Sequence, residues 1–159
     1  MTRKIGQITL VLLLSAALCA CGSGADGKKP GDGQTLLTTV KAIFQAPAGF
    51  AGPAKTLTVA GYKNWPPQNM PDTFFTMRQS PSIAVGSPFV FERADIEESG
   101  EYHIVGFLYV EGSWMPVCGR DYMVTYPGNP LDLDGGVHDL GTLVFEFVNP
   151  PISCNKPSS

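Results

Sequence analysis

The stretch EYHIVGFLYV, residues 101–110, decides the fold of this chain. Successive side chains of an extended strand point to opposite faces of the sheet. Here they form two apolar sets, with Tyr102, Ile104, Leu108 and Val110 on one face and Val105, Phe107 and Tyr109 on the other. Apolar residues on both faces are typical of a strand that is covered on both sides. The sequence therefore predicts a central strand over residues 101–110.

The segments on either side of this stretch also have the character of short strands. They are rich in β-branched and aromatic residues, turns of Gly, Pro, Asn and Asp separate them, and no helical period is sustained. The expected strands are residues 36–44, 55–62, 73–79, 83–85, 89–93, 121–126 and 142–148, with loops at 64–72 and 110–121. This pattern predicts an all-β fold, a single β-sandwich of about seven strands.

Two patterns in the second half resemble transthyretin-like, or prealbumin-type, β-sandwich domains. Gly100-Glu101-Tyr102-His103-Ile104 resembles the family's Gly-x-Tyr-x-Ile/Val element, which leads into the long central strand. Residues 130–147 resemble the family's final loop and last strand. The resemblance covers residues 89–148 and implies a binding, adhesion or structural role, but it transfers no site residues. Residues 55–85 lack the family's usual Gly-x-Pro-Leu-x-x-Ala opening, so an immunoglobulin-like sandwich is the alternative.

The start of the chain resembles a bacterial lipoprotein signal peptide. Arg3 and Lys4 precede an apolar run at residues 8–20, which is shorter than the roughly twenty residues of a spanning helix. The run ends in Leu-Cys-Ala-Cys21, which resembles a lipobox. The resemblance implies cleavage before Cys21, acylation of that cysteine, and a lipid anchor in the cell envelope. Since Gly22 rather than Asp follows, it implies the outer membrane. An ordinary signal peptide cut elsewhere is the alternative.

The expected organisation is a signal peptide at 1–20, a lipidated flexible tether at 21–34 and a β-sandwich domain at 35–155. The tether is rich in glycine and has no aliphatic side chain larger than Ala, a composition that behaves as a flexible coil. With Cys19 removed and Cys21 lipidated, Cys118 and Cys154 remain in an oxidising compartment. A disulfide between them is the prediction. A metal pair or a redox pair is the alternative, although neither has the close Cys-x-x-Cys spacing.

The composition disfavours several classes of function. The chain has 11 Lys and Arg against 14 Asp and Glu, and it has no basic stripe, so we expect no nucleic-acid partner. Ser113 lies in Gly-Ser-Trp-Met rather than in the Gly-x-Ser-x-Gly motif of a nucleophile elbow. There are only two histidines, and His103 on the central strand is interpreted as a structural residue. We therefore predict neither an enzyme nor a cofactor.

Two sets of residues are candidate metal ligands. Asp132-x-Asp134-Gly, followed by His138, resembles half of a calcium loop, but the later oxygen ligands and the closing Glu are missing. A plain turn is the favoured interpretation. Thioethers suit Cu(I), and the chain carries methionines at 70, 77, 115 and 123. They are scattered without a Met-x-x-Met pattern, so packing is the favoured interpretation.

The candidate partner surface lies on the two long loops, with Trp65 in one and Trp114 in the other. Loops on a rigid sandwich usually carry the binding contacts. We therefore predict a lipid-anchored envelope protein with a non-enzymatic binding or structural role. Its expected partners are the membrane, through the lipid, and an envelope protein or a glycan. The alternative is a lipoprotein that binds calcium or copper.

Overall fold

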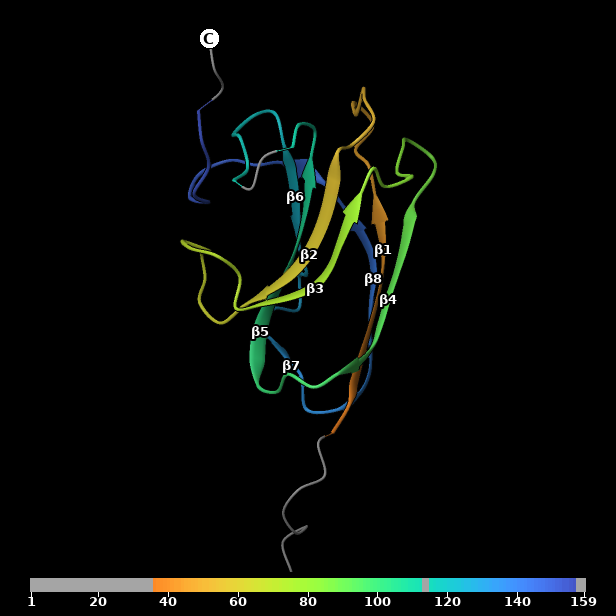
Figure 1. The fold of residues 1–159 in the computed structure, drawn as a ribbon, viewed down its shortest axis with the longest axis vertical. Coiled ribbons are helices and arrows are strands. Elements are labelled where there is room, and N and C mark those ends of the chain that lie inside the picture. Colours follow the sequence, from red (N-terminus) through yellow and green to blue (C-terminus); the bar gives the residue numbers. More distant parts are fainter. Residues whose placement is uncertain (1–35, 113–114, 157–159) are drawn as a thin grey trace, which may run out of the picture. The chain divides into compact units, whose positions relative to one another are not determined.

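The computed structural model describes residues 36–112 and 115–156. Over these residues the fold is all-β, with two packed sheets that form a β-sandwich (Figure 1). The strands are β1 (Thr38–Gln45), β2 (Thr56–Tyr62), β3 (Thr73–Gln79), β4 (Phe89–Ile96), β5 (Glu101–Tyr109), β6 (Tyr122–Thr125), β7 (Leu131–Asp132), β8 (Gly136–Val144) and β9 (Glu146–Phe147). The described residues include no helix that could cross a bilayer. The predicted fold class is confirmed.

The strands divide between a three-stranded and a six-stranded sheet. The smaller sheet has the order β4-β1-β8, and the larger has the order β3-β2-β5-β6-β9, with β7 paired to β5. β1 runs antiparallel to β4 and parallel to β8. Constant-type immunoglobulin domains instead place their first, second, fourth and fifth strands in one sheet. The pairing is therefore not immunoglobulin-like, and the transthyretin-like resemblance stays a prediction.

β5 lies in the middle of the six-stranded sheet, as its sequence predicts. It pairs with β2 along one edge and with β6 along the other. Its inner face, with Ile104 and Leu108, packs into the main core between the sheets. Its outer face contributes to a second set of buried residues, here called the outer cluster: Ala60, Tyr62, Val105, Phe107, Tyr109, Val148 and Ile152. Both faces of β5 are covered.

The end of the chain differs from the predicted strand at residues 142–148. β8 begins at Gly136, and the chain then changes sheets, so that β9 pairs with β6. Phe145 lies at the crossing, is fully buried and donates its backbone N–H to the Gln45 carbonyl at 3.0 Å. β8 pairs only with β1 among the described strands, so many of its side chains face solvent and its apolar pattern is weak.

The strand predicted at residues 83–85 is wrong. The segment forms a tight turn, in which the Ala84 and Ser87 backbones exchange hydrogen bonds of 3.2 and 3.0 Å. Gly86 has φ of 76°, a left-handed conformation that glycine adopts at little cost. Ile83 is buried, so the apolar run reflects a core contact made from a turn.

The main core depends on one close approach of side chains to the backbone. Phe44 packs against Phe145 with ring centroids 5.6 Å apart and against Phe91 at 6.0 Å. A Cβ atom on Gly106 would lie 2.9 Å from the Phe44 ring and 3.1 Å from Val124. Glycine at position 106 lets the Phe44 and Phe145 rings pack directly against the backbone of β5.

We predict that Gly106→Ala destabilises the domain by about 1–3 kcal/mol, because the added methyl overpacks the core. The free energy of unfolding in urea measures the effect. Gly49→Ala is the control, since a Cβ there meets nothing within 4 Å. It should change stability by less than about 0.5 kcal/mol. Equal effects at the two positions would contradict the packing argument.

Candidate functional site

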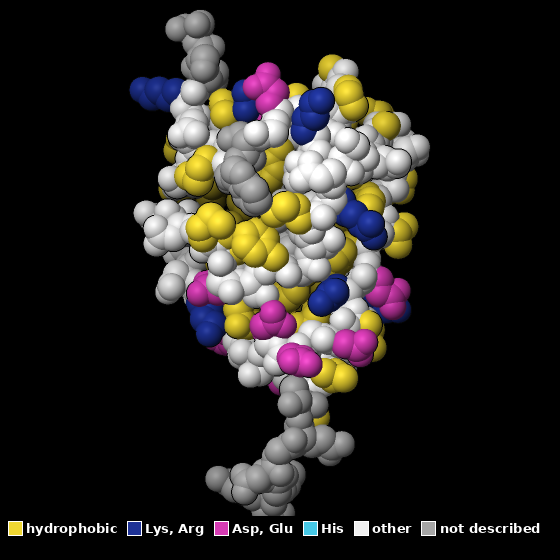
Figure 2. All heavy atoms as spheres, viewed as in Figure 1, with side chains coloured by type: hydrophobic (Ala, Val, Ile, Leu, Met, Phe, Trp, Pro, Cys, Tyr) yellow, Lys and Arg dark blue, Asp and Glu magenta, His cyan; other side chains and the backbone are white. Residues whose placement is uncertain are grey.

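A pocket of about 260 Å³ lies on the outer face of the six-stranded sheet, the face turned away from the smaller sheet. Strands β2, β3 and β5 form its floor with Thr56, Thr58, Tyr62, Phe74, Met77, Gln79, Phe107 and Tyr109. Its walls come from the β2–β3 loop (residues 63–72), the β5–β6 loop (residues 110–121) and the C-terminal segment (residues 148–156). Figure 2 shows hydrophobic side chains gathered between the first two of these loops.

The pocket arises because large side chains on one strand lie beside small side chains on the neighbouring strand. On the outer face β5 presents Phe107 and Tyr109, whereas β2 presents the smaller Thr56, Thr58 and Ala60 beside them. The large side chains require a cover, and the small ones leave space beneath that cover. The Thr56 and Thr58 side chains are buried at the bottom of this space.

The β2–β3 loop is closed at its base by hydrogen bonds to Asp72. The Lys63 backbone N–H donates to the Asp72 carboxylate at 2.7 Å, and the Asp72 N–H donates to the Gly61 carbonyl at 3.0 Å. The Lys63 ammonium group also lies 5.5 Å from the centroid of the Tyr102 ring. The two hydrogen bonds hold the ends of the loop together, and the Lys63–Tyr102 contact joins the loop to β5, so the pocket residues at 67–71 project from a fixed base.

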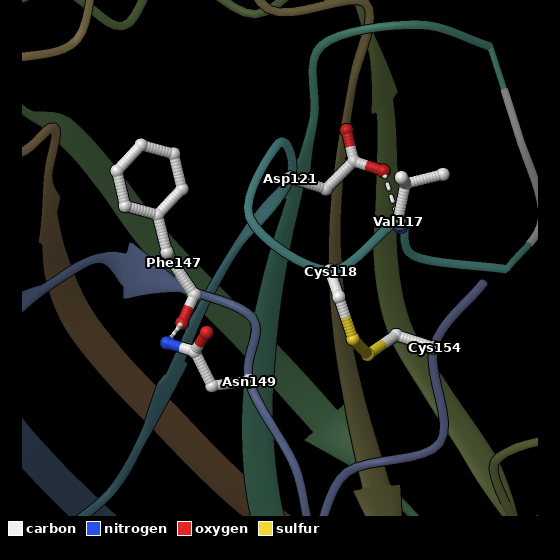
Figure 3. The surroundings of a disulfide bond; sticks show 6 residues. All are labelled: Val117, Cys118, Asp121, Phe147, Asn149 and Cys154. Carbon is white, nitrogen blue, oxygen red and sulfur yellow. Dashed lines mark hydrogen bonds between the residues drawn. A yellow bond between two sulfur atoms is a disulfide. The ribbon is translucent and has the colours of Figure 1, made fainter. Parts of the chain in front are cut away.

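Asp121 holds the β5–β6 loop in the same way but from a fully buried position. One carboxylate oxygen accepts the Val110 N–H at 2.9 Å. The other accepts the Val117 N–H at 2.8 Å, which Figure 3 shows. Arg120 donates to the second oxygen at 3.3 Å and to Glu111 at 2.6 Å. One side chain therefore ties the start and the end of the wall that contains Met115 and Pro116.

The predicted disulfide between Cys118 and Cys154 is present and joins two walls of the pocket (Figure 3). Backbone hydrogen bonds flank it: the Cys118 N–H donates to the Asn155 carbonyl and the Asn155 N–H donates to the Pro116 carbonyl, each at 2.9 Å. The C-terminal segment is thus fixed beside the β5–β6 loop. Ile152 and Ser153 line the pocket as a consequence.

The lining of the pocket is uncharged and largely apolar. None of its described residues is Asp, Glu, Lys, Arg or His. Burial, and then the nearby Asp72 carboxylate, raise the pKa of Tyr62 to about 12. Burial also raises the pKa of Tyr109, and Tyr62 and Asp121 add to the effect. Both phenols remain protonated at neutral pH, and in the described part of the chain neither donates a hydrogen bond. They are available as donors to a ligand.

The structure brings together the two loops that were expected to form the partner surface, but not around the predicted tryptophan. Trp65 is 43% exposed and lies against His103, with ring centroids 5.6 Å apart. It borders a different depression, here called the side groove, whose lining also includes Met123, Val144 and Phe147. Trp114 and Cys21 lie outside the described residues. The sequence does not single out Tyr62, and it favours a core position for Tyr109, because their alternation is also that of ordinary core residues.

Among the described residues the structure does not gather the candidate calcium ligands into a metal site, but it brings three of the four methionines to one pocket. Asp132 and Asp134 are exposed, and the His138 ring lies 3.2 Å from the Gly135 carbonyl. The described residues contain no group of three or more His, Cys, Asp or Glu able to hold a metal ion, so the calcium prediction gains no support. The methionines do converge in part: Met70, Met77 and Met115 all line the pocket, whereas Met123 lines the side groove.

We predict that Asp121→Asn destabilises the domain by about 1–3 kcal/mol, because the amide NH₂ cannot accept and one buried N–H loses its acceptor. Asp139→Asn is the control, since the exposed Asp139 accepts a hydrogen bond only from Gly141 among the described residues. That change should cost less than about 0.5 kcal/mol. Unfolding in urea compares the two variants, and an equally small loss at Asp121 would refute its role.

A scan against protein-family models, a search of curated proteins and a search of solved structures each found no match to this chain.

Proposed function

We propose that this protein is a non-enzymatic binding protein of the cell envelope, held there by a lipid on Cys21. Its pocket on the six-stranded sheet takes a small, uncharged and mostly apolar molecule. The observation that carries this proposal is a preformed pocket in which uncharged walls surround two protonated tyrosine hydroxyls. Small-molecule sites in proteins are usually concave and mostly apolar, with a few polar groups that orient the ligand.

Because the described lining residues carry no charge, the pocket favours an organic ligand without a net charge. An organic ion or a hard metal ion that entered this pocket would lose its hydration and find no opposite charge, which is strongly unfavourable. An apolar surface gains about 25 cal/mol for each Å² removed from water. The preferred organic ligand is therefore neutral.

The volume and the hydroxyls narrow the ligand further. A dry cavity of about 150 Å³ is enough for benzene in other proteins. The 260 Å³ found here accommodates one ring with a short substituent. An acceptor atom on that substituent would receive a hydrogen bond from Tyr62 or Tyr109, a contact worth about 1 kcal/mol. A ring that bears a carbonyl group combines these features.

The envelope location is supported by the first part of the sequence and by the disulfide. Arg3, Lys4 and the apolar run that ends at Cys21 have the order of a lipoprotein signal. A disulfide such as Cys118–Cys154 is typical of proteins in an oxidising compartment. The resemblance of residues 89–148 to transthyretin-like domains, which mostly bind or support structure, agrees with a binding role.

We predict that acetophenone binds more tightly than ethylbenzene, and that benzoate binds least. The first two differ by a carbonyl acceptor, and the third carries a charge. A hydrogen bond of about 1 kcal/mol corresponds to a roughly fivefold preference. Ligand-observed NMR titration of the full chain measures the order. In the Tyr62→Phe/Tyr109→Phe variant, acetophenone should lose its advantage over ethylbenzene.

The position of binding is tested with two matched variants. Phe74 and Phe147 are about equally exposed, but Phe74 lines the pocket and Phe147 lines the side groove. Phe74→Ala should weaken acetophenone binding, whereas Phe147→Ala should leave it unchanged. Benzoate binding as well as acetophenone, or equal losses in the two variants, would refute the proposed site.

The anchor generates a separate prediction. Cys21→Ala should move the protein from the membrane fraction to the soluble fraction in a bacterium that processes lipoproteins, because the cysteine that carries the acyl chains is absent. Mass spectrometry of the wild-type amino-terminal peptide should find acylated Cys21 as its first residue. An unmodified Cys21 in the membrane-associated protein would refute the anchor.

A further inference from the structure

We propose that the rim of the same pocket binds Cu(I) through the thioether sulfurs of Met70, Met77 and Met115. This inference goes beyond the proposed function and does not require an organic ligand to occupy the pocket. It depends on where the fold places the three methionines and on the chemistry of the groups around them.

The three methionines come from three different parts of the chain. Met70 lies in the β2–β3 loop, Met77 lies on β3, and Met115 lies in the β5–β6 loop. All three line one pocket of about 260 Å³. The sequence shows no short Met motif, because the set is assembled by the pairing of β2 with β3 and β5 and by the Asp121 contacts that hold the β5–β6 loop.

Packing in the core does not account for these side chains. Met70, Met77 and Met115 are 61%, 39% and 41% exposed, whereas the side chains of the main core are buried. A methionine side chain has three rotatable bonds and a polarizable sulfur, so a partly exposed one can turn toward a bound ion. The three thioethers thus line the pocket from backbones that the β2–β3 pairing and the Asp72 and Asp121 hydrogen bonds hold in place.

The surroundings select a soft cation of low charge. Thioether sulfur favours Cu(I), whereas Mg²⁺, Ca²⁺ and Mn²⁺ prefer carboxylate and carbonyl oxygens. The described pocket residues offer no carboxylate and no imidazole. The aromatic rings of Phe74 and Phe107 border the same space, and their faces attract a cation that has lost part of its hydration.

The first experiment is an anaerobic competition for Cu(I) against bathocuproine disulfonate, with the full chain and with Ag(I) as a redox-inert second probe. The test variant is Met70→Leu/Met77→Leu/Met115→Leu, which keeps side-chain volume and apolar character. Met123→Leu is the matched control, since Met123 lines the side groove. Circular dichroism and urea unfolding confirm that each variant is folded.

We expect the wild-type chain and Met123→Leu to bind both ions, and the triple variant to lose at least about 100-fold in affinity, since changes to groups that merely support metal ligands already cost 10–100-fold. X-ray absorption at the copper edge should show sulfur ligands in the wild type. Failure of the wild type to compete, or undiminished binding by the triple variant, would overturn the inference.

Acetophenone binding is measured on the same proteins to separate this inference from the proposed function. If Cu(I) binding is lost in the triple variant while acetophenone still binds, the thioethers are the metal ligands and the floor of the pocket is intact. If the wild type binds acetophenone but not Cu(I), the copper inference is wrong and the proposed function stands. If the wild type binds Cu(I) but not acetophenone, the proposed function is wrong and the copper site stands.

Discussion

Burial of both faces of β5 is the constraint on which the rest of the structure depends. The three-stranded sheet covers the inner face, where Ile104 and Leu108 join the main core. On the outer face no third layer of strands is present among the described residues, so the loops and the C-terminal segment cover Phe107 and Tyr109. The pocket is the part of the outer face that they leave open.

A cover made of loops needs anchors, because ordering each backbone residue costs about 1–2 kcal/mol of conformational entropy. Asp72 and Asp121 supply side-chain acceptors for backbone N–H groups at the base of each loop. The Cys118–Cys154 disulfide, whose ends are 36 positions apart in sequence, adds about 3–4 kcal/mol on the chain-entropy model. These contacts are already made in the chain alone, so little ordering cost would remain for the binding that we propose.

The central strand and the disulfide could be predicted, because the side chains of a fully buried strand alternate clearly in the sequence and the cysteines can be counted. The alternation in β5 identified the central strand, and counting the cysteines identified the disulfide. β8 was recognised only in part, since an edge strand exposes residues such as Val137 and Asp139 and does not alternate clearly. The floor of the pocket was not predictable, because it requires the register that places Thr56 opposite Tyr109. The meeting of Met70, Met77 and Met115 requires the same non-local pairing and the loop anchors.

The apolar ligand and the soft cation that we propose for this pocket share one physical cause. Without charged side chains in the described lining, the pocket cannot offset the lost hydration of an anion or of a hard divalent cation. Neutral groups of two kinds remain: protonated phenols, which donate to an acceptor, and thioethers, which donate electron pairs to a soft metal ion. A tyrosine phenol is neutral at physiological pH, and burial raises the pKa of Tyr62 and Tyr109 further, so the described lining stays uncharged throughout that range. The selectivity that we propose for this site therefore follows from how the sheet is covered, and ultimately from the aromatic outer face of β5.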